Sequence, residues 1–174
     1  MNAAHAHLLV NHLPVVGVLF AFLALVLSSI KKRDEMEWGA LVLFVVVGIA
    51  VLPAYFSGEG AEKVVEHLPG VAEKLIENHE ETAEAAAILT VITGLTALVG
   101  IFFRQHRTKV FLGLYLLSLI TGGTLAYTAK LGGEIRHQEI RKDFVPVQKG
   151  QGVMMGKEDE SAGEEEGEKG EEAR

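Results

Sequence analysis

The chain has 174 residues, of which 49% are hydrophobic and 22% charged, and its formal net charge is −7. This length fits one domain or one small membrane bundle, and without a basic patch we expect no nucleic-acid binding. The chain contains no cysteine, which excludes disulfides, Cys-ligated iron–sulfur clusters, covalent c-type haem and thiol catalysis.

Four charge-free apolar runs follow one another along the chain, at residues 13–30, 39–56, 85–103 and 110–129. Each is about as long as a bilayer-spanning helix needs to be. The alternative is four buried helices of a soluble protein, but a soluble helix keeps a polar face and these runs have none. We therefore predict an all-α fold, an integral membrane four-helix bundle formed by residues 1–149.

A structured loop is expected between the second and third runs. Residues 58–68 read as a short amphipathic helix, and Pro69 and Gly70 end it. A helix that begins at Val71 is expected to run unbroken into the third span. The fourth span is expected to continue to about Lys142.

The acidic C-terminal segment, residues 150–174, is rich in glycine and glutamate, a composition typical of disorder. Residues 157–174 alone hold nine acidic and three basic side chains, a net charge of −6. One interpretation is a solubilising tail without a partner. The other is that the tail recruits a basic soluble electron carrier, because flexible like charges steer a partner of opposite charge.

The basic residues of the loops indicate how the bundle is oriented. Residues 31–33 are Lys-Lys-Arg and follow the first run, whereas residues 1–12 contain no Lys or Arg. A secretory signal has the opposite order. The positive-inside rule puts this loop, and the loop with Arg104, Arg107 and Lys109, in the cytoplasm, although four basic residues after the fourth run argue against it. We expect both termini outside the cytoplasm, in a bacterial inner membrane or its equivalent.

Histidine is unevenly distributed over the predicted bundle. Six of the seven histidines fall on one side of the membrane, namely His5, His7, His12, His67, His79 and His137. Any single one fits an interfacial position, but ionisable groups that line a membrane mouth are functional candidates. We predict that at least two haem or metal ligands come from His12, His79, His137 and His67. For His5 and His7, close to the terminus, the sequence predicts no role.

Small residues form two helical stripes next to these histidines. Below His79 come Ala83, Ala86, Thr90, Thr93 and Ala97, and on the stripe of His137 come Gly133, Lys130, Ala126 and Gly123. Small residues in membranes commonly allow close helix contact. The other interpretation is that the stripes face each other around a flat macrocycle, with Gly133 in the wall and Lys130 and Arg136 pairing with its carboxylates.

Glu77, Glu80 and Glu84 form an acidic stripe beside His79. They are either solvated surface acids or part of a mixed His/carboxylate site that suits Zn, Mn or non-haem Fe. Glu80 or Glu84 is also placed to accept protons if a quinol is oxidised there.

Several short motifs look like those of a known family. They are Asn11-His12-Leu13-Pro14, Gly58, Gly60-Ala61-Glu62, His67-Leu68-Pro69-Gly70, His79-Glu80-Glu81 and Gly132-Gly133. Over about residues 5–140 the chain resembles an uncharacterised family of small four-span bacterial membrane proteins, a domain of unknown function. That family opens with His-Pro-x-x-Val-His-Phe-Pro, of which only the second half is matched here. Its members occur beside or fused to Rieske and cytochrome domains, so the resemblance implies redox work and carries over His12, His67, His79 and Gly132-Gly133.

These observations favour one function and leave two others open. The first is a membrane redox subunit, a b-type cytochrome-like protein in which His12 and His79 foremost ligate haem b. It would exchange electrons with quinone or an external carrier at the His-bearing face. The second is a non-haem site in which His12, His79, His137 and Glu80 hold Zn or non-haem Fe. The third is a structural subunit of a larger membrane complex, a homo-oligomer or a small transporter, although spans without charges argue against transport.

Overall fold

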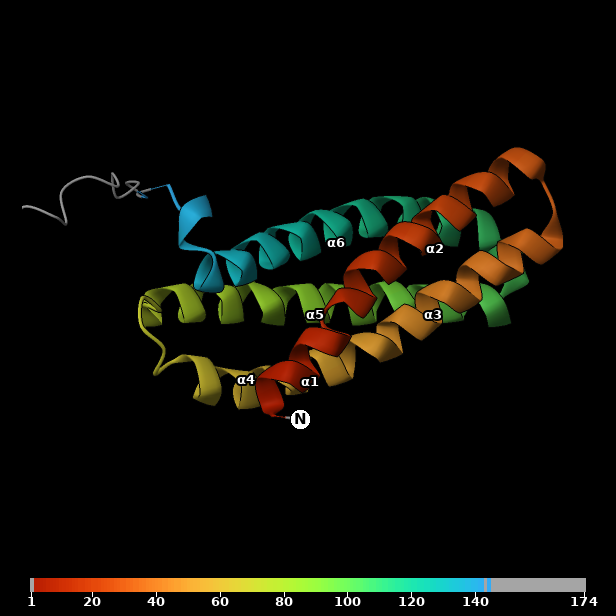
Figure 1. Cartoon of the computed structure of the whole chain (residues 1–174). Coiled ribbons are helices and arrows are strands. Elements are labelled where there is room, and N and C mark those ends of the chain that lie inside the picture. The colour runs from red at the N-terminus through yellow and green to blue at the C-terminus, as the bar shows by residue number, and fades with distance from the viewer. Residues whose placement is uncertain (1, 143, 145–174) are drawn as a thin grey trace, which may run out of the picture. The chain divides into compact units, whose positions relative to one another are not determined.

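The structure is a computed structural model that describes residues 2–142 and residue 144. Four long helices dominate it (Figure 1): α2 (His12–Lys31), α3 (Asp34–Phe56), α5 (Glu73–Phe102) and α6 (Arg107–Arg136). The shorter elements of the described part, which holds no strand, are α1 (Ala3–Val10), α4 (Gly58–Val65) and the 3-10 turns η1 (Arg104–His106) and η2 (Gln138–Ile140). These elements belong to one compact unit that ends at Arg141. The predicted disorder of residues 150–174 lies outside the described residues.

The helices are long and apolar enough to cross a membrane four times. The four stretches are Ala3–Lys31, Asp34–Val65, Glu73–Phe102 and Arg104–Arg136, with mean hydropathies of 2.5, 2.5, 2.2 and 1.7. Large apolar side chains on their outer faces, such as Phe20, Ile49, Ile88 and Leu116, are each more than half exposed. Such a surface suits lipid rather than water. The predicted all-α fold with four helices of membrane-spanning length is confirmed.

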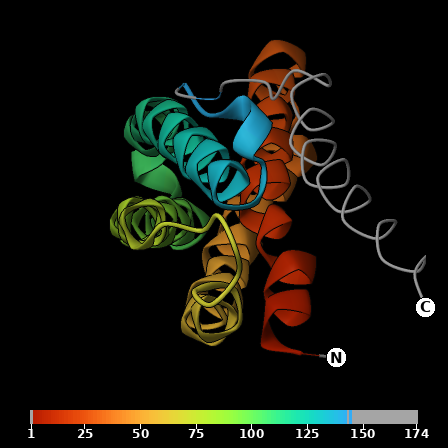
Figure 2. The same ribbon diagram turned by 60° about the vertical axis from the view of Figure 1, so that its left-hand side comes forward.

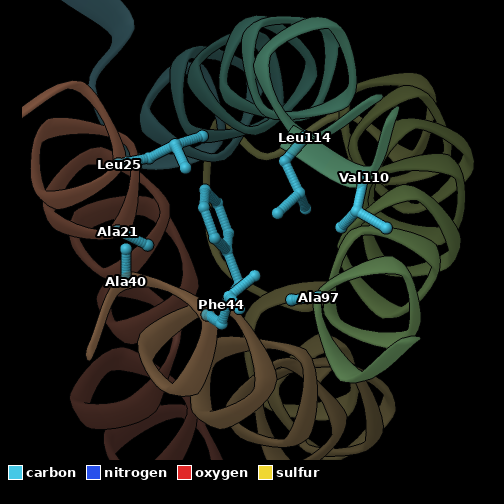
Figure 3. Close-up of a cluster of buried hydrophobic side chains, with 8 residues drawn as sticks. Ala21, Leu25, Ala40, Phe44, Ala97, Val110 and Leu114 are labelled. Carbon is cyan, nitrogen blue, oxygen red and sulfur yellow. The ribbon is translucent and has the colours of Figure 1, made fainter. Parts of the chain in front are cut away.

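The long helices pack in a ring in the order α2, α3, α5 and α6, and α6 closes the ring against α2. Buried side chains from all four fill the middle (Figure 3): Ala21, Leu25, Ala40, Leu41, Phe44, Ala97, Val110 and Leu114. The ring of Phe44 reaches from α3 across the interior toward Leu25 and Leu114. Lipid is as apolar as this core, so close packing rather than the hydrophobic effect holds such helices together.

Two glycines bring α3 and α5 into backbone contact. A Cβ on Gly94 would lie 3.1 Å from the Cα of Gly48 and 3.1 Å from the carbonyl oxygen of Phe44. Ala86, Thr90, Thr93 and Ala97 are buried on the same helix. The small residues in this part of α5 therefore allow close contact between helices.

Proline separates the long helices from the two short ones. Pro14 has no N–H to give to the carbonyl four residues earlier, and the helix breaks at Asn11, between α1 and α2. Pro53 lies inside α3 one turn before its C-cap, Ser57, after which α4 begins. α1 packs against α4, at the end of the unit where α5 begins and α6 ends (Figure 2). The term His-bearing end is used below for α1, α4, the start of α5 and the end of α6.

The connection between α4 and α5 differs slightly from its predicted bounds. The amphipathic helix is present but ends at Val65 instead of residue 68. The turn that follows holds Gly70 at a φ of +78°, a left-handed conformation that suits glycine. α5 begins at Glu73, two residues after the predicted start, and runs unbroken into the third span as predicted.

α6 ends at Arg136, earlier than the predicted end near Lys142. The guanidinium of Arg141 folds back and donates to the carbonyl oxygens of Glu134, at 2.7 Å, and Ile135, at 3.0 Å. These bonds satisfy acceptors that the last turn of a helix leaves open. The chain therefore turns away from the helix axis where the sequence predicted a continuous helix.

The opposite end of the bundle is tied together by ion pairs. The guanidinium of Arg107 lies 2.7 Å from the carboxylate of Glu37, and both side chains are less than one fifth exposed. Arg104 lies 3.0 Å from Asp34 in a more exposed pair. These contacts join the turn between α2 and α3 to the turn between α5 and α6.

Candidate functional site

His79 stands near the start of α5, half-buried against α6. Its Nδ1 lies 3.0 Å from the backbone carbonyl oxygen of Thr128. A carbonyl oxygen only accepts, so Nδ1 carries the proton of the neutral ring and Nε2 keeps its lone pair. Nε2 has no hydrogen-bond partner within residues 2–142. A hydrogen bond of this kind fixes the tautomer and the ring orientation of histidines that ligate metals.

Gly132 supplies the surface on which the ring of His79 rests. A Cβ on Gly132 would lie 2.9 Å from Cε1 of His79 and 3.3 Å from its Nδ1. One turn earlier on α6, the hydroxyl of Thr128 donates to the carbonyl oxygen of Thr82 on α5, at 3.2 Å. The two helices thus hold the ring against a glycine and beside a second bond between them.

Gly133 and Lys130, predicted to line a cofactor space, lie elsewhere. A Cβ on Gly133 would meet Cδ1 of Ile140 at 3.4 Å. The ammonium of Lys130 lies 2.7 Å from the carboxylate of Glu134 on its own helix. The structure therefore gives the glycine pair two separate surroundings, and only Gly132 touches His79.

The stripe that the sequence places above His137 is on the outside of α6. Gly123 and Ala126 are exposed. The face that meets α5 carries Thr121, whose hydroxyl lies 3.0 Å from that of Thr93, together with Thr128 and Gly132. The two predicted small-residue stripes do not face each other, so they enclose no space for a macrocycle between α5 and α6.

His12 and His67 are both exposed and make local contacts. Nδ1 of His12 lies 3.3 Å from the carbonyl oxygen of Leu8, one turn earlier. The side chain of His67 is 82% exposed, in the segment after α4, and its Nε2 lies 3.6 Å from Glu66. Neither contact orients the ring toward the half-buried ring of His79.

His137 caps α6 and is exposed. Its Nδ1 lies 2.9 Å from the carboxylate of Glu139. The backbone amide of Glu139 and the ring of His137 hold the pKa of that carboxyl below its usual value. Within residues 2–142, no three His, Asp or Glu side chains converge closely enough to hold a metal ion. The structure therefore does not gather the four predicted ligands into one set.

His7, for which the sequence predicts no role, is fixed at the same end of the bundle. It lies on α1, where the side-chain oxygen of Asn2 caps the helix by accepting from the amide of His5 at 2.9 Å. Nδ1 of His7 lies 2.9 Å from the hydroxyl oxygen of Ser57, at the end of α3. The imidazole thus joins two helices that proline separates from the spans.

Charged and titratable groups are also present on α1, α4 and the start of α5. His7 lies on α1, which packs against α4 at this end. Glu80 adjoins His79 in sequence, and Glu62 lies on α4. The candidate site is therefore His79 at the start of α5, held by Thr128 and Gly132 of α6.

Two residues of the His-bearing end have different sequence signals. Gly132 belongs to the pair Gly132-Gly133 that the sequence singles out, and in the structure only Gly132 contacts His79. For His7 the available signal is local: Asn2 is a favoured N-cap residue, and an alanine- and leucine-rich stretch follows it. That signal predicts an ordered helix, but no local pattern predicts the bond to Ser57, fifty residues away.

Comparisons with models of protein families, with curated proteins and with solved structures found no match to this chain. The resemblance to the four-span family stays a prediction. The function is therefore argued from the site alone.

Proposed function

We propose that this chain is a membrane redox subunit that binds haem b at its His-bearing end, where His79 would hold the haem. One observation carries the proposal: Thr128 and Gly132 hold the ring of His79 with an unprotonated Nε2. Iron ligation requires that tautomer, and a hydrogen bond from the other ring nitrogen increases the basicity of the ligating one.

The donor set favours haem over a bare metal ion. Haem iron takes at most two ligands from the protein because its porphyrin supplies the rest. Zinc takes three or four protein ligands, and non-haem iron centres take a similar number. The described part of the chain brings no three such side chains together, which supports a group that needs fewer.

The residues around His79 have separate tasks in this proposal. Haem supplies one-electron transfer when it is bound, and Thr128 and Gly132 hold the ring that ligates it. Glu80 and Glu62 lie at the same end and are placed to accept protons if the electron donor is a quinol. Electrons are exchanged with quinone or with an external carrier at the outer face, where we propose that both termini lie.

The absorption spectrum of the purified protein tests the proposal. Protein extracted in detergent from haem-replete cells should show a Soret band and a sharp reduced α-band. His79→Ala should remove most of this absorbance. The matched control is His67→Ala, since the side chain of His67 is 82% exposed and lies beside Glu66, and it should leave the spectrum unchanged.

Two results would replace the proposal with a named alternative. A colourless protein with stoichiometric Zn or Fe in metal analysis would indicate the non-haem site. A protein without haem or metal would indicate a structural subunit of a larger complex or homo-oligomer.

A further inference from the structure

A groove lies at the opposite end of the bundle from His79. Its volume is about 360 Å³, and it runs between the last turn of α2, the first turn of α3 and the first turns of α6. Five of its lining residues belong to α6, namely Arg107, Thr108, Phe111, Leu112 and Tyr115. Ligand pockets have volumes of about 300–1,000 Å³, so the groove can hold a headgroup and part of a chain.

The groove is polar at one end and apolar at the other. Arg107 is the first residue of α6, and Tyr115 lies about 12 Å further along the helix at a rise of about 1.5 Å per residue. Between them, Phe111 is half-buried and Leu112 is 65% exposed. Because Leu112 lies on the outer surface of an apolar span, the apolar end of the groove is open to lipid. An amphipathic occupant fits this order of side chains.

The polar end carries one charge of each sign. Nη1 of Arg107 lies 2.7 Å from Oε2 of Glu37, which also lines the groove. Nη2 of Arg107 and Oε1 of Glu37 make no hydrogen bond within residues 2–142. The ion pair therefore leaves a cationic donor and an anionic acceptor side by side, a combination that favours a headgroup with both charges.

Contacts between helices hold both sides of the groove in place. The Arg107–Glu37 pair joins α6 to α3. The hydroxyl of Tyr115 lies 2.7 Å from Oγ of Ser29 on α2, another lining residue, and 3.2 Å from the carbonyl oxygen of Leu25. An occupant therefore meets walls that are already positioned, which reduces the ordering cost of binding.

The surrounding turns add a surplus of positive charge. Residues 31–37 and 104–109 together contain six basic and three acidic side chains. Such a surplus next to a membrane attracts lipid phosphates of any headgroup type. The carboxylate of Glu37 inside the groove is the feature that distinguishes one headgroup from another.

We propose that this groove binds a phospholipid with a phosphoethanolamine headgroup. The phosphate accepts from Nη2 of Arg107 and from the hydroxyl of Thr108, at the start of a helix, where an anion is favoured. The primary ammonium donates to Oε1 of Glu37, and an acyl chain lies along Phe111 and Leu112. A choline headgroup has no N–H to donate, and a glycerol headgroup has no positive charge to offset Glu37.

Native mass spectrometry of the full chain in a mild detergent tests this selectivity. The protein is offered equal concentrations of phosphatidylethanolamine, phosphatidylcholine and phosphatidylglycerol with the same acyl chains. It should retain the ethanolamine lipid at least about tenfold more than either of the others, the effect of one hydrogen bond between charged groups.

Two variants locate the binding in the groove. Glu37→Gln should remove the preference for phosphatidylethanolamine, and circular dichroism checks that this variant folds. Thr108→Val keeps the shape of its side chain and leaves the Arg107–Glu37 pair intact, and it should weaken retention of this lipid about threefold, the effect of one ordinary hydrogen bond. The matched control is Arg104→Gln, which removes an exposed charge at the same end and should keep the preference.

Three results would overturn the proposal. Equal retention of the three lipids, or stronger retention of phosphatidylglycerol, would mean that the charge of the turns alone governs binding. A preference that survives in both Glu37→Gln and Thr108→Val would place the lipid elsewhere. Soluble phosphoethanolamine that binds as tightly as the lipid would assign the groove to a free phosphate ester. None of these results depends on haem, so the proposed function is tested separately.

Discussion

The close contact between Gly132 and His79 limits the size of the side chain that residue 132 can carry. We predict that Gly132→Ala destabilises the protein by about 1–3 kcal/mol, the usual effect of inserting a methyl group into a packed site. The new Cβ would lie 2.9 Å from Cε1 of His79, so the ring must shift from the position in which Thr128 holds it. A lower midpoint of thermal unfolding in detergent, with a weaker haem spectrum, is the expected result.

Gly133→Ala is the control for this change, one position along the same helix. Its Cβ would meet only the far end of Ile140, at 3.4 Å. The midpoint and the spectrum should stay close to those of the wild type. Equal effects of the two substitutions would show that the contact with His79 does not limit residue 132.

Single residues of the His-bearing end differ in how far the sequence reveals them. His79 is predictable because it lies shortly before a charge-free run, where a polar ring must meet other helices or water. His7 is not, because its role depends on Ser57, which only tertiary structure brings near. Gly132 and Gly133 have the same sequence signal, and only the rotation of α6 about its axis separates them.

At the scale of the helices, the contact of Gly48 with Gly94 determines how closely α3 and α5 approach. We predict that Gly94→Ala lowers the free energy of unfolding by about 1–3 kcal/mol, because its Cβ would lie 3.1 Å from the backbone of Gly48. Thermal unfolding followed by circular dichroism in detergent measures the change.

Gly39→Ala supplies a matched control on α3. A Cβ there meets nothing within 4 Å, so the substitution should be neutral or stabilise the helix by up to about 1 kcal/mol. A similar loss of stability in both variants would mean that glycine itself, and not the close approach of two helices, matters at these positions.

The four long helices and α4 were predictable, but α1 and the inward face of α6 were not. Charge-free runs of bilayer length identify four spans whatever their packing, and the break after α4 follows from Pro69 and Gly70. A helix that is apolar on every side has no periodicity to mark its buried face. The stripe of Gly133 and Lys130 was therefore indistinguishable in sequence from that of Thr128 and Gly132.

For the molecule as a whole, the charge of the loops predicts the orientation in the membrane. The absence of native cysteine allows single-cysteine labelling without background. Glu66→Cys, after α4, and Gln105→Cys, in η1, change exposed residues at opposite ends of the bundle. A membrane-impermeant maleimide should label residue 66 in intact cells, and residue 105 only after the cells are opened. The reverse pattern would place the termini in the cytoplasm.

The charge of the C-terminal segment also concerns the molecule as a whole. Truncation after Gly156 removes a net charge of −6, and we predict slower electron exchange with a basic soluble carrier at low salt. The difference should fade at physiological ionic strength, where the Debye length is about 8 Å. Stopped-flow rates at two salt concentrations measure it, with the absorption spectrum as a control for the site. Equal rates at low salt would assign the segment a solubilising role only.

The breaks at Asn11 and Ser57 suggest an order of assembly. α1 and α4 have eight residues each, too short to be stable helices on their own, whereas the ring of α2, α3, α5 and α6 has a core independent of them. The ring can therefore insert and close first, while the two short helices dock last. Docking then brings His7 to the hydroxyl of Ser57 at the end of α3, so this end of the bundle is the last part of the fold to become ordered.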